Sequence, residues 1–276
     1  MTVSGQRRLT LTLSYGIVLF GAVVFIFPIA WLILGSLKPP ADLMEVALPR
    51  QLTLENYVTV LRNFPVGRYL LNSLIVAVGS TSLSLILGGL AAYGFVRYHF
   101  RARSFFLLFT LLMRMLPAIA VGIPLYLLFS RLGLTDTFPG LIVAHAGAQL
   151  PLVIWIVHGF LEDIPAELTD AGLVDGCNRL TVLFRIILPL AAPGLAVAAI
   201  FSFLLSWNDF GLSVILISTP DLLTMPVGMS QMNLLYGVRW DNLSAAAVAY
   251  IVPTLVLALL LQRYIVRGLT MGAVKG

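Results

Sequence analysis

Charged residues are scarce in this sequence. Only 11% of its 276 residues are Asp, Glu, Lys or Arg, whereas 59% are hydrophobic. A soluble domain carries about 25% charged residues, so this composition excludes an ordinary soluble protein and predicts an integral membrane protein. The formal net charge of +5 does not require a nucleic-acid partner, because Lys and Arg gather in the cytoplasmic loops of membrane proteins.

Cysteine and histidine are also rare. The single cysteine, Cys177, excludes an internal disulfide and a cysteine-based metal site. The three histidines, His99, His145 and His158, are scattered along the chain and do not form a ligand cluster. The sequence offers no nucleophile with a neighbouring base. We therefore expect no catalytic residues, no metal and no cofactor.

Two further motifs are missing. The chain has no G-x-x-x-x-G-K-[ST] phosphate-binding motif, so an ATP-driven function would need the nucleotide to bind on another polypeptide. The six apolar runs described next hold no Asp or Glu, and Asp209 lies just beyond the end of the fifth. A secondary transporter driven by an ion gradient would want such intramembrane carboxylates, so their absence counts against that class.

Apolar runs of roughly 20 residues, long enough to cross a bilayer, occur six times. The first extends from about Leu9 to Leu37, which is too long for the apolar region of a signal peptide, and no small-x-small cleavage site follows. The sequence predicts an all-α integral membrane protein with about six transmembrane helices. The predicted spans are Tyr15–Leu34, Tyr69–Tyr93, Phe105–Phe129, Pro139–Phe160, Leu190–Trp207 and Leu243–Tyr264.

The basic residues indicate the orientation. With the N-terminus inside, ten of the 17 Lys and Arg residues fall in the inside segments and six in the outside segments, while Arg114 lies within the third span. This excess predicts cytoplasmic N- and C-termini. Because no repeat, low-complexity segment or linker interrupts the chain, we expect residues 1–276 to form a single transmembrane domain.

A charged segment lies between spans four and five, at about residues 161–189. Pro165 suits the first position of a helix, Asp175-Gly176 would end that helix, and Asn178 would cap a second one. Pro189 then marks the start of span five. The pattern predicts a helix-turn-helix at the cytoplasmic surface, with no core of its own chain to bury its apolar side chains.

This hairpin is either a plain connection or a docking element. It is much longer than the usual link between bundle helices. It would also leave Leu, Val and Ile side chains near solvent, which suggests an interaction surface. These features favour docking of a cytoplasmic partner.

The hairpin resembles the "EAA" coupling loop of permease subunits in binding-protein-dependent ABC importers. The stretches "LTLENYVTVL", "IPLYLLFSRLGLTDT", "WNDF" and "RGLTMGAVKG" resemble the carbohydrate branch of that family, and within it the maltose-type second permease subunit. The likeness covers most of the chain. The matching positions are Asp170-Ala171-Gly172 for E-A-A, Asp175-Gly176-Cys177 for D-G-A and Leu188-Pro189 for L-P.

The resemblance implies a non-catalytic transport subunit in the cytoplasmic membrane of a bacterium or archaeon. Its solute would be a sugar or an oligosaccharide; a non-sugar solute such as a polyamine or a phosphonate is the alternative within the class. The implied partners are a second permease subunit, two ATP-binding subunits and an extracytoplasmic solute-binding protein. The residues implied in ATPase coupling are Asp170, Ala171, Gly172, Asp175, Gly176, Arg179 and Pro189. Gly172, where the family has Ala, should soften the first helix of the hairpin.

The C-terminal tail, about residues 265–276, is implied as a second contact with the ATPase. Three glycines would let an extended backbone pass through a narrow interface. The alternative is a frayed tail. The implied contact residues are Thr270, Gly272, Lys275 and Gly276.

Polar residues in or near the spans are candidates for the solute pathway. Trp207, Asn208 and Asp209 combine an aromatic ring, an amide and a carboxylate, which suits sugar hydroxyls and the C–H face of a sugar ring; ordinary residues of the membrane interface would give the same pattern. Gln149 and His145 either contact solute or form hydrogen bonds between helices. Arg114 must face the helix bundle or extend to the membrane surface, because Arg at the bilayer centre costs about 2.5–3.5 kcal/mol.

Overall fold

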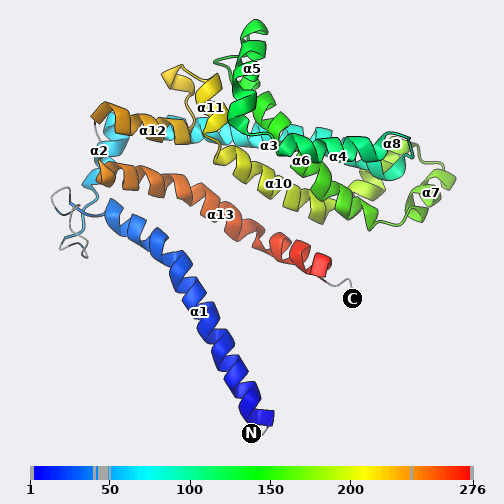
Figure 1. Cartoon of the computed structure of the whole chain (residues 1–276), viewed down its shortest axis with the longest axis horizontal. Helices are drawn as coiled ribbons and strands as arrows, with labels where there is room; N and C mark the ends of the chain where they lie inside the picture. The colour runs from blue at the N-terminus through cyan, green and yellow to red at the C-terminus, as the bar shows by residue number, and fades with distance from the viewer. Residues whose placement is uncertain (1–2, 40–41, 43–48, 50, 237–238, 274–276) are drawn as a thin grey trace. The chain divides into compact units, whose positions relative to one another are not determined.

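The computed structural model describes residues 3–39, 42, 49, 51–236 and 239–273 (Figure 1). Every regular element in these ranges is a helix, so the predicted all-α class is confirmed. The chain divides into two compact units, Met1–Val66 with Met229–Val252 and Gly67–Gly228 with Pro253–Gly276, and each is described by itself. The prediction of a single domain stays a prediction.

In the first unit, a buried amide fixes the end of a long apolar helix. Helix α1 (Val3–Ser36) is followed by the short helix α2 (Glu55–Asn63). Asn56 of α2 is buried, and its Nδ2 donates to the carbonyl oxygens of Ser36 at 2.9 Å and Lys38 at 2.8 Å. The apolar surface of α1 itself is exposed, as a helix in contact with lipid requires.

In the second unit, three long helices pack closely at small residues. They are α3 (Val66–Arg97), α6 (Phe138–Glu162) and α10 (Ala192–Trp207). A Cβ on Gly88 of α3 would lie 2.7 Å from Cγ1 of Val153 in α6, and Gly194 of α10 meets the ring of Phe160 in the same way. Small residues thus let the helices approach each other, as is usual between membrane helices.

The core of this unit reaches from the long helices into the segment before α10. That segment contains α7 (Glu167–Val174), α8 (Arg179–Val182), the π-helical turn η2 (Leu183–Ile187) and α9 (Leu188–Leu190). The buried core residues are Ala92, Tyr93, Val153, Val157, Leu161, Val182, Leu183, Ile187, Ala191 and Ala198.

The remaining elements are shorter helices and one long terminal helix (Figure 1). They are α4 (Arg103–Arg114), α5 (Ala118–Arg131), α11 (Gly211–Leu216), the 3-10 turn η3 (Pro220–Leu222), α12 (Met225–Tyr236) and α13 (Trp240–Ala273).

Among the described residues, four helices are long and apolar enough to cross a membrane: α1 from Leu11, α3, α6 and α13 up to Leu260. The helices Arg179–Leu190 and Ala192–Trp207 add a fifth if they form one span bent by 75°. The third predicted span is divided between α4 and α5. Pro117 lies at the break, where it lacks an N–H and disfavours helical backbone at Leu116. The six-span count therefore stays a prediction.

Candidate functional site

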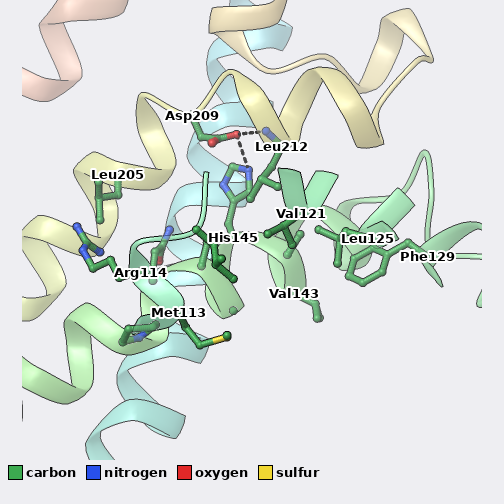
Figure 2. A pocket seen from close by; sticks show the side chains of 16 residues that line it. Met113, Arg114, Val121, Leu125, Phe129, Val143, His145, Leu205, Asp209 and Leu212 are labelled. Carbon is green, nitrogen blue, oxygen red and sulfur yellow. Dashed lines mark hydrogen bonds and ion pairs between the residues drawn. The ribbon is translucent and has the colours of Figure 1, made fainter. Parts of the chain in front are cut away.

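A cavity of about 600 Å³ opens in the second unit, beside the break between α4 and α5 (Figure 2). Its volume is in the range of sites for small ligands. Most of its wall is apolar, and the polar side chains are few. The lining residues are Met113, Arg114, Leu116, Val121, Leu125, Phe129, Val143, Ala144, His145, Gly147, Ala148, Gln149, Pro151, Leu205, Asp209 and Leu212.

Arg114 is the cation of this wall. It is the last residue of α4 and lies where the predicted third span breaks. Its side chain is exposed to the cavity, and no residue in the described ranges gives it a hydrogen bond or an ion pair. The structure thus places Arg114 on the cavity wall.

Asp209 and His145 form a polar tie across the cavity rim. Oδ1 of Asp209 lies 3.2 Å from Nε2 of His145, which is almost fully buried. The same Oδ1 accepts from the backbone amides of Leu212 at 3.0 Å and Ser213 at 3.1 Å (Figure 2). Nδ1 of His145 lies 2.7 Å from Oγ of Ser206. The tie links α6, the end of α10 and the start of α11.

Gln149 is held by serines from two other helices. It is 3% exposed. Its Oε1 accepts from Oγ of Ser84 in α3 at 3.3 Å and from Oγ of Ser202 in α10. The acceptor end of the amide is thereby occupied inside the bundle, so the NH₂ end is what Gln149 can offer to the cavity. Hydrogen bonding between helices, one of the two readings of Gln149 and His145, is present for both residues.

The structure does not bring together the predicted trio of Trp207, Asn208 and Asp209. Only Asp209 lines the cavity. Trp207 is 1% exposed and stacks on Phe203 with ring centroids 5.6 Å apart, while Nδ2 of Asn208 donates to the carbonyl of Leu204 at 2.8 Å. Successive residues at a helix end point about 100° apart, so neighbours in sequence do not share one surface.

The serines that hold His145 and Gln149 were not predicted from the sequence. Ser80 and Ser84 are four residues apart on α3, and Ser202 and Ser206 are four apart on α10. Each pair therefore lies on one helix face. Oγ of Ser80 donates to Oγ of Ser206 at 3.0 Å, which joins the two faces. This spacing within apolar runs was the available signal.

A second aspartate fixes the far end of α11. Oδ1 of Asp136 accepts from the backbone amides of Ser218 at 2.6 Å and Thr219 at 2.8 Å. Burial raises the pKa of Asp136, but these hydrogen bonds lower it more, so the net pKa lies below its ordinary value. Asp136 has a positive φ of 54°, a conformation that Asp tolerates better than most residues. Both ends of α11, which carries Leu212 on the cavity wall, are thus held by carboxylates.

The hairpin at about residues 161–189 has the turn that the sequence predicts, but its first helix, α7, begins at Glu167, two residues after the predicted start at Pro165. Helix α7 ends at Val174, and Gly176 has a positive φ of 85°. The amide of Cys177 donates to the carbonyl of Gly172 at 3.0 Å, and the amide of Gly176 donates to that of Leu173 at 3.1 Å. This pair of bonds is the Schellman ending of a helix.

The second helix of the hairpin begins at the predicted cap. Oδ1 of Asn178 accepts from the amide of Thr181 at 2.8 Å. The helix then passes through the π-helical turn η2 and bends at Ala191 into α10. A π-helical turn is rare and is often found at functional sites.

Gly172 has a different role from the one expected. It is buried, and a Cβ there would lie 2.9 Å from Cδ1 of Ile186 and 3.0 Å from Cγ2 of Val182. The missing side chain lets α7 pack closely against the second half of the hairpin. Gly172 therefore serves packing within the hairpin, and its softening of α7 stays a prediction.

The expectation that no core of the chain buries the hairpin is wrong. Val182, Leu183 and Ile187 are buried against α3 and α6. Nη2 of Arg97 donates to the carbonyl of Ile164 at 3.0 Å, and the guanidinium of Arg179 lies 5.3 Å from the centre of the Tyr98 ring. On the exposed face of the hairpin, apolar side chains remain at Leu168, Leu173, Val174 and Leu180, while Phe184 is exposed beside α3.

The other predicted coupling residues lie on or beside the exposed face. Asp170, Ala171, Asp175, Gly176 and Arg179 are exposed. Pro189 is exposed in α9, next to the bend.

The C-terminal segment is helical where an extended tail was expected. Helix α13 continues to Ala273 and includes the backbone of Thr270 and Gly272. Lys275 and Gly276 lie outside the described residues. Among the described residues, no group of three or more His, Cys, Asp or Glu side chains could hold a metal ion.

Several apolar helices around a cavity with few polar groups define a multi-span membrane transport protein. The chain belongs to the family described as binding-protein-dependent transport system inner membrane component, whose family model matches residues 84–271. That family consists of transport components rather than catalysts.

Curated relatives match along nearly the whole chain. The trehalose transport system permease protein SugB of Mycobacterium tuberculosis is 36% identical, covering 99% of this chain and 100% of the relative. The sulfoquinovosyl glycerol transport system permease protein SmoH of Agrobacterium fabrum is 34% identical over 91% and 89% of the two chains. The trehalose/maltose permease protein MalG of Thermococcus litoralis is 34% identical over 92% and 93%.

A solved structure shares the fold. It belongs to a bacterial ABC transporter involved in the import of the acidic polysaccharide alginate, and matches with a TM-score of 0.81. The match covers 96% of this chain and 98% of the other at 21% identity.

Proposed function

We propose that this chain is one of two permease subunits of an ATP-driven importer for a sugar or an oligosaccharide. Relatives at 30–36% identity transport glycosides by name: trehalose, maltose, sulfoquinovosyl glycerol and arabinooligosaccharides. The cavity of about 600 Å³ has room for a sugar. The protein would lie in the cytoplasmic membrane of a bacterium or archaeon with both termini in the cytoplasm, the orientation that the basic residues favour.

The solute would meet three polar side chains on the cavity wall. Arg114 and the amide nitrogen of Gln149 supply donors for sugar oxygens, and Asp209 supplies an acceptor for hydroxyl groups. The free cation of Arg114 disfavours a polyamine, the alternative solute, because like charges repel. Trp207 and Asn208 hold the end of α10 beside this wall.

The hairpin would receive ATP-binding subunits carried on separate chains. The observation that carries this assignment is its two-sided character: one face is buried in the permease core, and the other is exposed and apolar. A hairpin clamped by Arg97 and Arg179 would move together with α3 and α10. Asp170, Ala171, Asp175 and Gly176 would contact the ATPase, while Gly172 and Pro189 would shape the hairpin.

The remaining partners follow from the family. A second permease subunit would complete the pathway, and an extracytoplasmic binding protein would deliver the solute. A structural neighbour with a TM-score of 0.68 is described in complex with an alginate pentasaccharide-bound periplasmic protein. The C-terminal segment, with Thr270 and Gly272 in α13 and with Lys275 and Gly276 further along the sequence, would form a second contact with the ATPase.

Val174→Glu and Leu180→Glu test the docking face, since these side chains are 87% and 65% exposed. We expect insertion into the membrane to continue while the ATP-binding subunits bind about tenfold more weakly or worse, as buried interface positions typically cost more than 1 kcal/mol. Co-purification of the ATP-binding subunits and uptake in proteoliposomes measure this. Leu132→Glu, an exposed apolar position between α5 and α6, is the matched control. Normal co-purification and uptake in both hairpin variants would reject the docking role.

A further inference from the structure

The two charged side chains of the cavity wall, Arg114 and Asp209, differ in whether the chain supplies partners for their charge. Oδ1 of Asp209 accepts from two backbone amides and from Oγ of Ser213 at 3.3 Å, and it lies 3.2 Å from Nε2 of His145. Its negative charge is therefore well compensated within the chain. Arg114 has no such partner among the described residues, and in Figure 2 no dashed line reaches it.

Arg114 lies within an apolar run of the sequence, and an ionisable side chain in such a run usually faces the bundle interior or a water-filled cavity and marks a functional site. Arg114 also interrupts the predicted third span at a helix break, where it faces a cavity instead of another helix. The side chain is thus placed to meet a charge that is not part of this chain.

Gln149 adds a directed donor to the same wall. Its Oε1 is occupied by Ser84 and Ser202, which come from two different helices. These serines fix the amide so that its NH₂ group remains for the cavity. Guanidinium and amide N–H groups together match the oxygen atoms of an anionic group, and Arg binds such groups through two parallel hydrogen bonds.

We propose that the cavity binds an anionic saccharide, with Arg114 and the amide nitrogen of Gln149 holding its carboxylate or sulfonate group. Ser84 and Ser202 are positioning residues for Gln149. This inference rests on the proposed function and names its substrate class. It also fits the hydrogen bonds that Asp209 accepts from its own neighbours, because a carboxylate without such donors on the same wall would repel the anion more strongly.

The test compares D-glucuronate with D-glucuronamide, which has nearly the same shape and no charge. Binding of each to the complete transporter in nanodiscs is measured by ligand-observed NMR. We expect glucuronate to bind about tenfold more tightly or better, and Arg114→Gln to abolish the difference, because Gln carries no charge to pair with the carboxylate. Arg114→Lys should retain part of it. Arg131→Gln, an exposed site outside the cavity, should retain all of it.

Positioning by the serines has its own readout. Ser84→Ala with Ser202→Ala frees the Gln149 amide to rotate, so we expect weaker binding of glucuronate with the preference for the charged form retained through Arg114. An unchanged affinity would remove the two serines from the proposal.

Equal binding of the two compounds by the unmodified transporter would overturn the proposal, as would an unchanged preference in Arg114→Gln. Absence of saturable binding by both would do so too. A counter-charge for Arg114 on the second permease subunit would show itself as equal binding. If proteoliposomes still accumulate neutral sugars, the proposed importer function stands without this inference. If they accumulate no saccharide, neutral or acidic, the proposed function itself is wrong.

Discussion

Oδ1 of Asp209 lies 3.2 Å from Nε2 of His145, and Nδ1 of His145 lies 2.7 Å from Oγ of Ser206. The imidazole is therefore held at both nitrogen atoms by residues near the end of α10. One ring in the middle of α6 thus fixes where α10 ends and where α11 begins. Since all three segments line the cavity, the shape of the cavity depends on this ring.

Replacing the ring of His145 tests how much it stabilises the fold. In His145→Phe the size is similar, but Asp209 and Ser206 each lose a partner. A buried polar group left unsatisfied costs about 1–3 kcal/mol, so the variant should unfold at a lower temperature. Thermal unfolding of the purified permease measures this. His99→Phe, which changes an exposed histidine, should stay within about 0.5 kcal/mol of the unmodified protein. Equal stability of the two variants would show that the interactions of His145 with Asp209 and Ser206 do not stabilise the fold.

Gly176 should be sensitive to any side chain. Its φ of 85° lies in the left-handed region, where a Cβ costs roughly 1–2 kcal/mol. We expect Gly176→Ala to distort the hairpin turn and to reduce ATP-driven uptake while the protein still inserts. The control is Gly159→Ala in α6, where an added Cβ meets no atom within 4 Å. Uptake in proteoliposomes that is the same for both variants would contradict the prediction.

The lowered pKa of Asp136 predicts that the folded protein loses stability at acid pH. Its pKa is lowered in the folded protein, because the amide hydrogen bonds outweigh burial. The resulting stability is fully present above the unfolded pKa of about 3.9 and is lost as the pH falls through the lower folded pKa. Asp136→Asn keeps a residue that tolerates positive φ but removes the titration. Thermal unfolding measured against pH should show a shallower acid decline for the variant; an identical decline would exclude this carboxylate as a cause.

Truncation at the end of α13 is expected to change the regulation of ATP hydrolysis more than the assembly of the transporter complex. Deleting Met271–Gly276 shortens a helix whose backbone is regular up to Ala273. If this end contacts the ATPase, the truncated complex should assemble with an altered stimulation of ATP hydrolysis by solute. A chain in which the same residues are replaced by serine separates length from sequence. Unchanged hydrolysis and unchanged solute response would show that the segment has no role in coupling.

Local features of the fold could be predicted because they depend on neighbours in sequence. The end of α7 at Asp175-Gly176 and the cap at Asn178 follow from backbone geometry and short side chains. Contacts between distant segments could not be predicted in the same way. Nothing in the local pattern shows that Gln149 meets Ser84 and Ser202, since this depends on how three helices are rotated against each other.

Two features show the same limit. Trp207 and Asp209 are two residues apart in sequence, yet one is buried in the core and the other lines the cavity; that both belong to the solute pathway stays a prediction. The hairpin was expected to have no core to bury its apolar side chains. The core comes from α3 and α6, and burial by remote helices leaves no mark in a local stretch of sequence.

Because the second half of the hairpin passes through the π-helical turn Leu183–Ile187, the number of residues there determines which way the exposed residues of α8 point. Each residue turns an α-helix by about 100°. Loss of one residue from this turn would rotate the exposed residues of α8 around the helix axis by that angle relative to α10, although no side chain on the docking face had changed. A single insertion or deletion between Asn178 and Pro189 would therefore aim an intact surface in the wrong direction.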